Sequence, residues 1–314
     1  MPIFYTIITL IYSMLEKVVV TGGGGFIGSK LANTLLEKGY KVVVFDIATD
    51  NMSKRLNPEV QQITGDVRNP SQLSNIFKGV KYVFHCAALP RLKYSFDFPR
   101  ETNEVNVAGF LNVLLAARDA GVCRVINSSS SSVYGLQNRL PLTEAMIPQP
   151  ISPYAAQKQM TEQYAGLFTR IYNLETVSLR YFSVYGPNDN IHDQQATIIS
   201  NFINLRKEGK PLTINGTGKQ SRDFTHVKDI VRANILAAEG LKIGNGEIIN
   251  VGTGKRTSVN RITKLVGGKI ERVDARLEPH DTLADNSRAR KLMNWQPTIE
   301  IKDGISELKK EAGI

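Results

Sequence analysis

Cysteine and histidine are scarce in this 314-residue sequence. The two cysteines, Cys86 and Cys123, stand in separate apolar segments, and no CxxC pair occurs. The four histidines are scattered, with no spacing typical of metal ligands. We therefore expect no bound metal. We also predict that both cysteines are buried small residues in a reducing compartment, the cytoplasm, and form no disulfide.

Two other features are missing: an apolar run long enough to cross a bilayer and a dense basic cluster. A transmembrane helix needs about 20 apolar residues. The apolar stretch at residues 2–13 is shorter and lacks the charge pattern of a signal peptide, so we interpret residues 1–13 as an extension upstream of a start at Met14. The net charge of +10, without basic runs interleaved with aromatics, favours an anionic small ligand over nucleic acid.

Short valine-rich strands alternate with amphipathic helices as far as Tyr181. The predicted strands cover residues 17–21, 41–45, 60–64, 82–86, 124–127 and 176–181, and the predicted helices cover 26–38, 70–78, 102–120 and 153–172. This alternation predicts an α/β fold with a Rossmann-type, doubly wound parallel sheet in residues 14–181. Frequent proline, glycine and asparagine turns after Tyr181 indicate a smaller C-terminal substrate domain, residues 182–314, part of which returns to the first domain.

Four consecutive glycines, Gly22 to Gly25, separate the first strand from the first helix. Such glycines let the backbone approach a pyrophosphate, and the N–H groups of the helix N-terminus then bind the phosphates. Asp46, at the end of the second strand, would accept hydrogen bonds from a ribose diol and repel a 2′-phosphate, which favours NAD over NADP. GxGxxG from Gly23 and GxxGxxG from Gly22 both fit, and both include Gly25 and Gly28.

The stretch "ISPYAAQK" places Tyr154 and Lys158 four residues apart, on one face of a predicted helix. Lowering the pKa of a tyrosine from about 10 to about 7 takes roughly 4 kcal/mol. A lysine about 4 Å away in a partly screened site supplies a term of that order, so the pair is a candidate general base for a hydroxyl group. The serine run from Ser128 to Ser132 follows a predicted strand, at the sheet edge where such folds bind ligands.

From about residue 14 to the C-terminus, these ordered motifs resemble the extended short-chain dehydrogenase/reductases, in particular the NAD-dependent nucleotide-sugar epimerase/dehydratase branch. "TGGGGFIG" is similar to that family's TGxxGxxG, which implies the register that begins at Gly22. The family's usual threonine after "NxxG" is replaced here by Phe110. The NAD contacts that the resemblance implies are Gly22, Gly25, Phe26, Ile27, Gly28, Asp46, Asp66, Val67, Ala87, Ala88, Asn106, Tyr154 and Lys158.

The resemblance also implies a reaction. Its catalytic residues would be Ser130, Tyr154 and Lys158, and its substrate contacts Lys93, Ser130, Tyr154, Ser183, Arg222 and Asp281. The 4,6-dehydratases of this family carry an acidic pair, and the UDP-glucuronate decarboxylases a glutamate, where this chain has Ser131 and Ser132. A hydroxyl cannot replace a carboxyl in that proton transfer. The resemblance therefore implies 4-epimerisation of a UDP-hexose, either UDP-glucose/UDP-galactose or an N-acetylated form, through a 4-keto intermediate.

Departures from the family pattern leave alternatives open. Ser183 stands where glucuronate epimerases often carry a small hydroxyl residue, and Lys93 lies near the position of their carboxylate-binding arginine, which raises UDP-glucuronate as a substrate. Glu278 and His280 depart from an RPGD-like segment. A nucleotide-sensing member without catalysis is a further alternative. The resemblance implies a homodimer that pairs through the helices predicted at 102–120 and 153–172.

Overall fold

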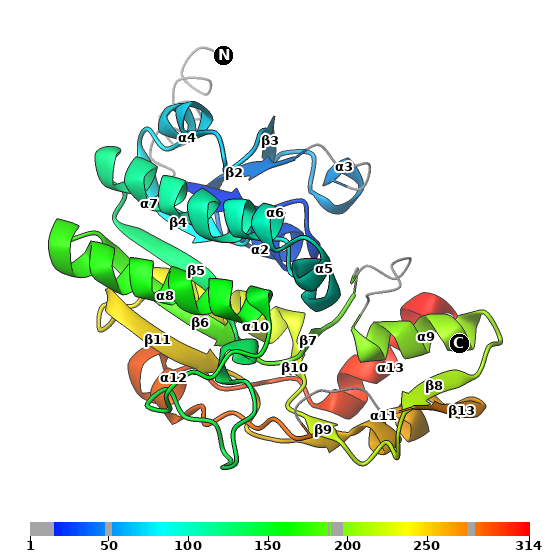
Figure 1. The fold of residues 1–314 in the computed structure, drawn as a ribbon. Helices are drawn as coiled ribbons and strands as arrows, with labels where there is room; N and C mark the ends of the chain where they lie inside the picture. Colours follow the sequence, from blue (N-terminus) through cyan, green and yellow to red (C-terminus); the bar gives the residue numbers. More distant parts are fainter. Residues whose placement is uncertain (1–15, 48–51, 188, 190–196, 275–279) are drawn as a thin grey trace, which may run out of the picture.

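The computed structural model describes residues 16–47, 52–187, 189, 197–274 and 280–314, so the extension at 1–13 and Glu278 lie outside the described residues. The central strands are β1 (Lys17–Thr21), β2 (Lys41–Asp46), β3 (Gln61–Thr64), β4 (Val80–His85), β5 (Arg124–Ser130), β6 (Glu175–Tyr181) and β11 (Asn245–Val251). All are parallel, in the spatial order β11, β6, β5, β4, β1, β2, β3 (Figure 1). The predicted doubly wound α/β sheet is confirmed.

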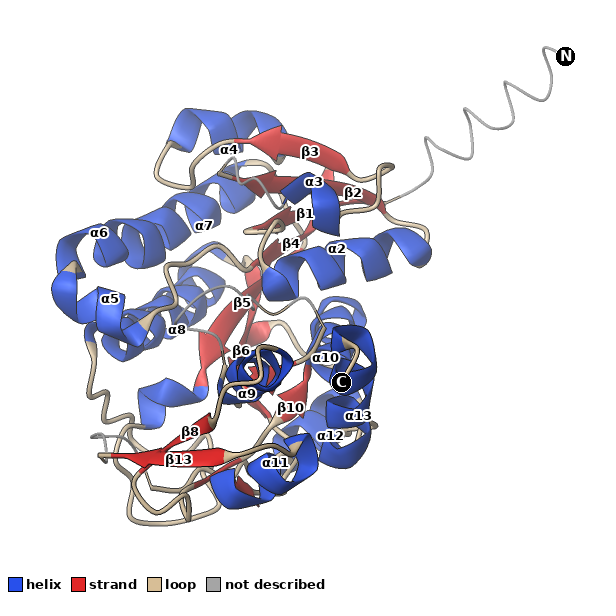
Figure 2. Ribbon diagram, turned by 90° about the vertical axis from the view of Figure 1, so that its right-hand side faces the viewer, coloured by secondary structure: helices blue, strands red, loops and turns tan. Residues whose placement is uncertain are grey.

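Helices cover both faces of the sheet, so its inner strands are apolar on both sides (Figure 2). Val18 and Val20 pack towards α2 (Phe26–Glu37) and α10 (Val227–Glu239), whereas Val19 packs towards α4 (Pro70–Ile76), α7 (Gly109–Asp119) and α8 (Pro153–Tyr172). Successive strand residues point to opposite faces, and both faces are buried here. This is why the strands are continuous valine runs rather than alternating patterns.

Elements of the C-terminal half pack in two separate apolar clusters. α10, β11 and α12 (Ser287–Met293) pack in and against the central sheet. A separate apolar cluster joins α9 (Ile198–Lys207), α11 (Val259–Val266) and α13 (Ile301–Ala312) with β8 (Leu212–Asn215), whose partner strand is β13 (Ile270–Val273). The C-terminal half also contains two short ladders: β7 (Val184–Tyr185) pairs with β10 (Thr225–His226), and β9 (Ser221–Arg222) pairs with β12 (Thr257–Ser258).

The long helix predicted at 102–120 is divided in the structure. It consists of α6 (Pro99–Asn103), a π-helical turn (Glu104–Ala108) and α7. Pro99 starts α6, because a proline at the first helical position lacks only an N–H that would be unpaired anyway. π-turns are frequent at functional sites, and this one carries Asn106. The shorter helices α3 (Met52–Arg55) and α5 (Leu92–Asp97) flank the carboxyl edge of the sheet, and a 3₁₀ turn (Ser131–Tyr134) follows β5.

The burial prediction for the cysteines is wrong for Cys123, which is exposed. It directly precedes β5, and the side chains on either side of it, Val122 and Arg124, are the buried ones. Cys86 is half-buried at the end of β4, where its sulfur accepts a hydrogen bond from the Ser128 hydroxyl at 3.4 Å. Both are free thiols, as expected for cysteines that form no disulfide.

Candidate active site

The glycine turn lies at the carboxyl ends of β1 and β4, where the strand order reverses and open α/β sheets bind ligands. Gly22 has φ +69°, and a Cβ added there would lie 2.4 Å from the Ala87 backbone nitrogen. A Cβ on Gly28 would lie 2.2 Å from the Gly22 carbonyl oxygen. Only glycine fits at these two positions, which are the first and last glycines of the register that begins at Gly22. Gly25 is less confined and stands at the N-cap of α2.

The N-terminus of α2 offers open donors. Its N-cap makes no side-chain hydrogen bond, and its first turn, which begins with Phe26 and Ile27, contains no acidic residue. Asp46 lies beside this turn: its Oδ2 accepts from the Gly24 N–H at 2.8 Å and its Oδ1 from the Ile47 N–H at 2.8 Å. Burial raises the pKa of Asp46 against the lowering effect of these two hydrogen bonds. Free N–H groups beside a carboxylate suit a pyrophosphate next to a ribose diol.

The loops after β3 and β4 supply four more of the predicted cofactor residues, Asp66, Val67, Ala87 and Ala88. Asp66 pairs with Arg68 at 2.6 Å, and this pairing lowers the pKa of the Asp66 carboxyl. Val67 is buried against Gly109, where an added Cβ would lie 2.6 Å from a Val67 methyl group. Ala87 and the neighbouring Ala88 are half-buried beside Gly22.

Asn106, in the π-turn, is buried and holds this loop in place. Its Oδ1 accepts from the Leu89 N–H at 2.8 Å, and its Nδ2 donates to the Leu89 carbonyl at 3.2 Å and to Gln157 Oε1 at 2.8 Å. Gln157 in turn donates to Thr102 Oγ1 at 2.9 Å. One amide therefore connects the π-turn, the loop after β4 and α8.

The start of α8 positions the candidate catalytic pair. Ser152 caps the helix by accepting from the Ala155 N–H at 3.2 Å, and Pro153 occupies the first turn. Lys158 is buried, and its Nζ donates to the Ser128 carbonyl oxygen at 2.7 Å. The same Nζ lies 5.9 Å from the centroid of the Tyr154 ring.

Ser130 completes the group. Its hydroxyl accepts from the Ser132 N–H at 3.1 Å and is hydrogen bonded to the Tyr154 side chain. The structure therefore brings together the three predicted catalytic residues, Ser130, Tyr154 and Lys158, at the end of β5.

Burial dominates the electrostatics of this group. It raises the pKa of Tyr154 to about 12, while the hydrogen bond to Ser130 acts in the lowering direction. Burial also lowers the pKa of Lys158 to about 8. The tyrosine shift is opposite to the direction expected from the lysine alone. The reason is that the phenolate loses water on burial, while the ammonium is directed at the Ser128 carbonyl.

The predicted substrate residues fall into two sets. Ser183, after β6, has φ +25°, an uncommon backbone conformation for a residue other than glycine. Such conformations concentrate at functional sites. Arg222 and Asp281 lie together on the C-terminal part: Arg222 donates to the carbonyl of His280, the residue before Asp281, at 3.1 Å. Asp281 accepts from the Ser221 hydroxyl. Although burial acts to raise it, the hydrogen bonds to Asp281 hold the pKa of its carboxyl below the usual range.

Lys93, which was also predicted to contact the substrate, is engaged elsewhere. Its exposed ammonium pairs with Asp97 at 2.6 Å, along the same short helix, α5. A different residue of α5 faces the site: the buried Ser95 hydroxyl accepts from the Tyr154 backbone N–H at 3.2 Å. Sequence reasoning missed Ser95 and Gln157, because their partners lie far away in the sequence and no motif marks them.

Residues 18–252 match the sequence profile described as the NAD dependent epimerase/dehydratase family. The chain belongs to this family.

Relatives of known name cover nearly the whole chain. A UDP-glucuronate 4-epimerase of Thermodesulfobacterium geofontis is 34% identical over 91% of this chain and 93% of its own length. A UDP-glucose 4-epimerase of Mycolicibacterium smegmatis is 33% identical over 93% and 96%. The crystal structure of the UDP-glucose 4-epimerase of Thermotoga maritima with UDP-glucose matches at a TM-score of 0.90, with 32% identity over 95% of this chain and 98% of that one.

NAD is the cofactor of this family member, as the sequence predicted. The residues present fit it: the glycine turn leaves a cradle that a Cβ would fill, the α2 N-terminus presents N–H donors, and Asp46 presents a carboxylate. Among the described residues, no group of three or more histidine, cysteine, aspartate or glutamate side chains is arranged to hold a metal ion. In the same residues, no helix combines the length and apolarity needed to span a bilayer.

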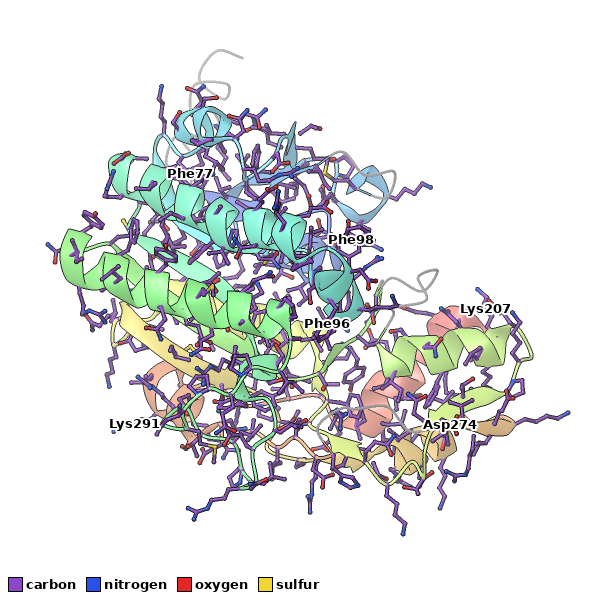
Figure 3. The ribbon with its side chains drawn as sticks, viewed as in Figure 1. Phe77, Phe96, Phe98, Lys207, Asp274 and Lys291 are labelled. Atoms are coloured by element: carbon purple, nitrogen blue, oxygen red, sulfur yellow. The ribbon has the colours of Figure 1, made fainter. Side chains whose placement is uncertain are left out.

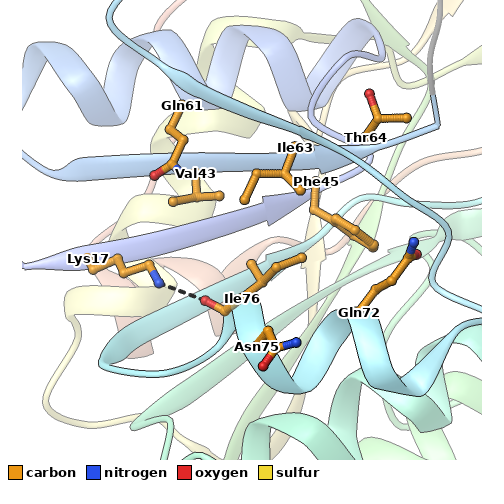
Figure 4. A pocket seen from close by; sticks show the side chains of 9 residues that line it. All are labelled: Lys17, Val43, Phe45, Gln61, Ile63, Thr64, Gln72, Asn75 and Ile76. Atoms are coloured by element: carbon orange, nitrogen blue, oxygen red, sulfur yellow. Dashed lines mark hydrogen bonds between the residues drawn. The ribbon is translucent and has the colours of Figure 1, made fainter.

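A cavity of about 400 Å³ lies away from these residues, between β2, β3 and α4 (Figure 4). Val43, Phe45, Ile63 and Ile76 contribute its apolar side chains. Lys17 closes one end by donating to the Ile76 carbonyl at 2.7 Å. None of the predicted site residues lines this cavity. We therefore do not assign the active site to it.

Proposed function

We propose that this protein is an NAD-dependent 4-epimerase of a UDP-hexose, with UDP-glucose and UDP-galactose as the substrate pair. The observation that carries the proposal is the convergence of Ser130, Tyr154 and Lys158 beside the dinucleotide cradle. The similarity to UDP-glucose 4-epimerases over nearly the whole chain supports the same substrate class.

In the proposed mechanism, Tyr154 is the general base. In its ionised form, the phenolate oxygen takes the proton of the C4 hydroxyl and becomes the neutral phenol, and Ser130 shares that hydrogen bond, so the substrate oxygen, serine and tyrosine form one relay. Lys158 contributes a fixed positive charge that favours the phenolate. When bound, NAD supplies reversible hydride acceptance at C4 and the positive charge of its nicotinamide ring. Tyr154 then returns the proton when the 4-keto sugar is reduced on its other face.

Inverting C4 requires that the sugar turns while the nucleotide stays bound. We assign that anchoring to Arg222 and Asp281, which lie together on the C-terminal part, remote in sequence from the catalytic serines. Arg222 suits a diphosphate because a guanidinium presents several donors to phosphate oxygens.

The residues after Ser130 argue for epimerisation rather than dehydration. Ser131 and Ser132 open the 3₁₀ turn after β5 and are half-buried. Neither carries a carboxyl that could remove a carbon-bound proton or protonate a leaving hydroxide. Oxidation at C4 and its reversal need no such group.

UDP-glucuronate is the second candidate substrate. Ser183 and the relative from T. geofontis favour it, whereas Lys93 is engaged with Asp97 on the outside of α5. If UDP-hexose is the substrate, Lys93→Ala leaves activity within about twofold. Activity confined to UDP-glucuronate and abolished by Lys93→Ala would establish the second candidate instead.

We propose further that the protein is a cytoplasmic homodimer that pairs through α8 and its neighbours. Met160, Leu167 and Ile171 form an exposed apolar stripe on α8. Phe96 on α5, labelled in Figure 3, is also exposed. Sedimentation should give twice the 34.8 kDa chain mass, and Leu167→Asp with Ile171→Asp should give monomers. Leu241→Asp, at a residue 99% exposed elsewhere, is the control. A monomeric wild type would contradict the dimer.

A substrate panel tests the proposed reaction. Purified protein is incubated with UDP-glucose, UDP-N-acetylglucosamine or UDP-glucuronate, with NAD but no other redox partner, and the sugars are followed by NMR. We expect UDP-galactose to form from UDP-glucose until equilibrium. No 4-epimer from any of the three, in protein shown to be folded and to contain NAD, would contradict the proposal.

A further inference from the structure

Side chains on one face of α8, spaced one turn apart, meet consecutive serines at the end of β5. Lys158 Nζ contacts the carbonyl oxygen of Ser128 at 2.7 Å. One turn later, Glu162 Oε1 accepts a hydrogen bond from the Ser129 hydroxyl at 2.6 Å. Tyr154, one turn before Lys158, meets the next serine. The proposed mechanism uses the first and last of these contacts and gives Glu162 no role.

Glu162 is fully buried and makes an ion pair. Arg180 donates to its two carboxylate oxygens from Nε at 2.8 Å and from Nη2 at 2.7 Å. The side chains of Glu162 and Arg180 are 0% and 2% exposed. Ser129 and Arg180 are register partners on β5 and β6. A single carboxylate therefore joins α8 to both strands beneath the catalytic group.

The pair is also fixed from its far side. The Arg180 guanidinium lies 4.6 Å from the Tyr134 ring centroid, and the Tyr134 hydroxyl donates to Asn250 Oδ1 at 2.7 Å. Tyr134 ends the 3₁₀ turn that Ser130 caps. Glu162 is thus linked to the proposed catalytic serine, Ser130, by two routes. One runs through the adjacent residue Ser129, and the other runs through Arg180 and the 3₁₀ turn.

We propose that Glu162 is a positioning residue: by holding Ser129, it sets the distance from the two adjacent serines to Lys158 and Tyr154. The inference rests on the proposed function, in which these contacts serve proton transfer. Ser129 is covalently joined to Ser128 and Ser130, so a shift of its backbone moves both of these neighbours. Misplacing reacting groups by about 1 Å can cost a factor of about 100 in rate.

Ser129→Ala tests this most gently, because it removes one hydrogen bond and leaves the ion pair intact. Ser178→Ala is the matched control. Ser178 is a buried serine on the adjacent strand β6, and its hydroxyl accepts from Asn127 at 3.1 Å. We expect Ser129→Ala to lower kcat about tenfold or more with KM changed less than twofold, and Ser178→Ala to leave kcat within twofold. Similar thermal stability of the two variants would show that the difference is not a loss of folded protein. Equal kcat values would overturn the proposal.

A double-mutant cycle gives the second readout. Glu162→Leu removes the acceptor of the Ser129 hydroxyl and should lower kcat at least as much as Ser129→Ala. Adding Ser129→Ala to it should cause little further loss, because both variants remove the same contact. Glu175→Leu is its control, since it likewise removes a carboxylate that pairs with a buried arginine, Arg124, at the opposite end of the same strands. Fully additive losses would overturn the proposal.

Crystal structures of both serine variants separate this inference from the proposed function. A shift of Ser130 away from Tyr154 in Ser129→Ala, absent from Ser178→Ala, would support positioning whatever the substrate is. Unchanged placement of Ser130 would overturn it. An inactive wild type would instead count against the proposed function.

Discussion

Lys158 Nζ donates a 2.7 Å hydrogen bond to the carbonyl oxygen of Ser128, at the end of β5. Burial lowers the pKa of this lysine to about 8, so it remains mostly protonated at pH 7. The Ser128 carbonyl therefore holds the Lys158 ammonium at 5.9 Å from the centroid of the Tyr154 ring. The lysine ammonium therefore has a fixed position beside the tyrosine ring, and the serine strand determines that position.

Lys158→Met should abolish most activity without unfolding the protein. Loss of the fixed charge that favours the phenolate should lower kcat by about 100-fold or more. Because the folded-state pKa of about 8 lies below the ordinary lysine pKa of 10.5, folding releases a proton between these values. Wild-type stability should then rise relative to the variant as pH increases from 8 to 10.5. Urea unfolding of both proteins at pH 7, 9 and 10 measures this, and a constant difference would refute it.

Gly28→Ala should prevent NAD binding and destabilise the fold, because its Cβ would lie 2.2 Å from the Gly22 carbonyl oxygen. Gly166→Ala is the matched control: it lies inside α8, and beyond the adjacent helix backbone no atom lies closer than 3.6 Å to its added Cβ. Alanine is favoured over glycine in a helix by about 0.5–1 kcal/mol, so the control should be slightly stabilised. Thermal melts and the NAD content of the purified variants give both results. NAD retained at wild-type level in Gly28→Ala would contradict the assignment of the glycine turn to NAD binding.

Asp46→Asn should weaken the preference for NAD over NADP by about tenfold. The aspartate repels a 2′-phosphate and accepts hydrogen bonds from a ribose diol, and the amide does neither as well. Asp66→Asn serves as control, because Asp66 pairs with Arg68 and lies in another loop. It should affect both cofactors alike. Dissociation constants for the two cofactors, measured by calorimetry, test the prediction, which fails if the ratio for Asp46→Asn equals that of the wild type.

Acid should destabilise the protein partly through His85. This side chain is buried and hydrogen bonded to Thr21 Oγ1 at 2.8 Å, and burial lowers its pKa to about 3. An unfolded histidine takes up a proton below about pH 6.5, so stability is lost as pH falls from 6.5 towards 3. His85→Gln removes this dependence. Its stability relative to wild type should improve by up to about 1.4 kcal/mol per pH unit on acidification, and parallel stability curves would exclude the effect.

The cofactor half of the site could be predicted because its signals are local. The strand, the glycine turn, α2, β2 and Asp46 follow one another within 30 residues, and each has its own sequence pattern. Tyr154 and Lys158 were found in the same way, from spacing within one helix.

What could not be predicted depends on packing between distant segments. Ser95 and Glu162 contact the site through partners 59 and 33 residues away, and single polar residues carry no signal for such contacts. The raised pKa of Tyr154 follows from burial by the whole site. Cys123 lies in an apolar segment, but its exposure depends on where β5 begins. Lys93 has a partner four residues away, Asp97, which a helical reading of 92–97 would have suggested.

In the proposed reaction, C4 is oxidised and then reduced within one bound sugar. The most direct measurement uses UDP-galactose carrying deuterium at C4, incubated with the protein and NAD in ordinary water until equilibrium. We expect UDP-glucose that retains the deuterium at C4, because the hydride never leaves the site, and no product from Tyr154→Phe. Loss of deuterium to solvent, or equal conversion by Tyr154→Phe, would contradict it.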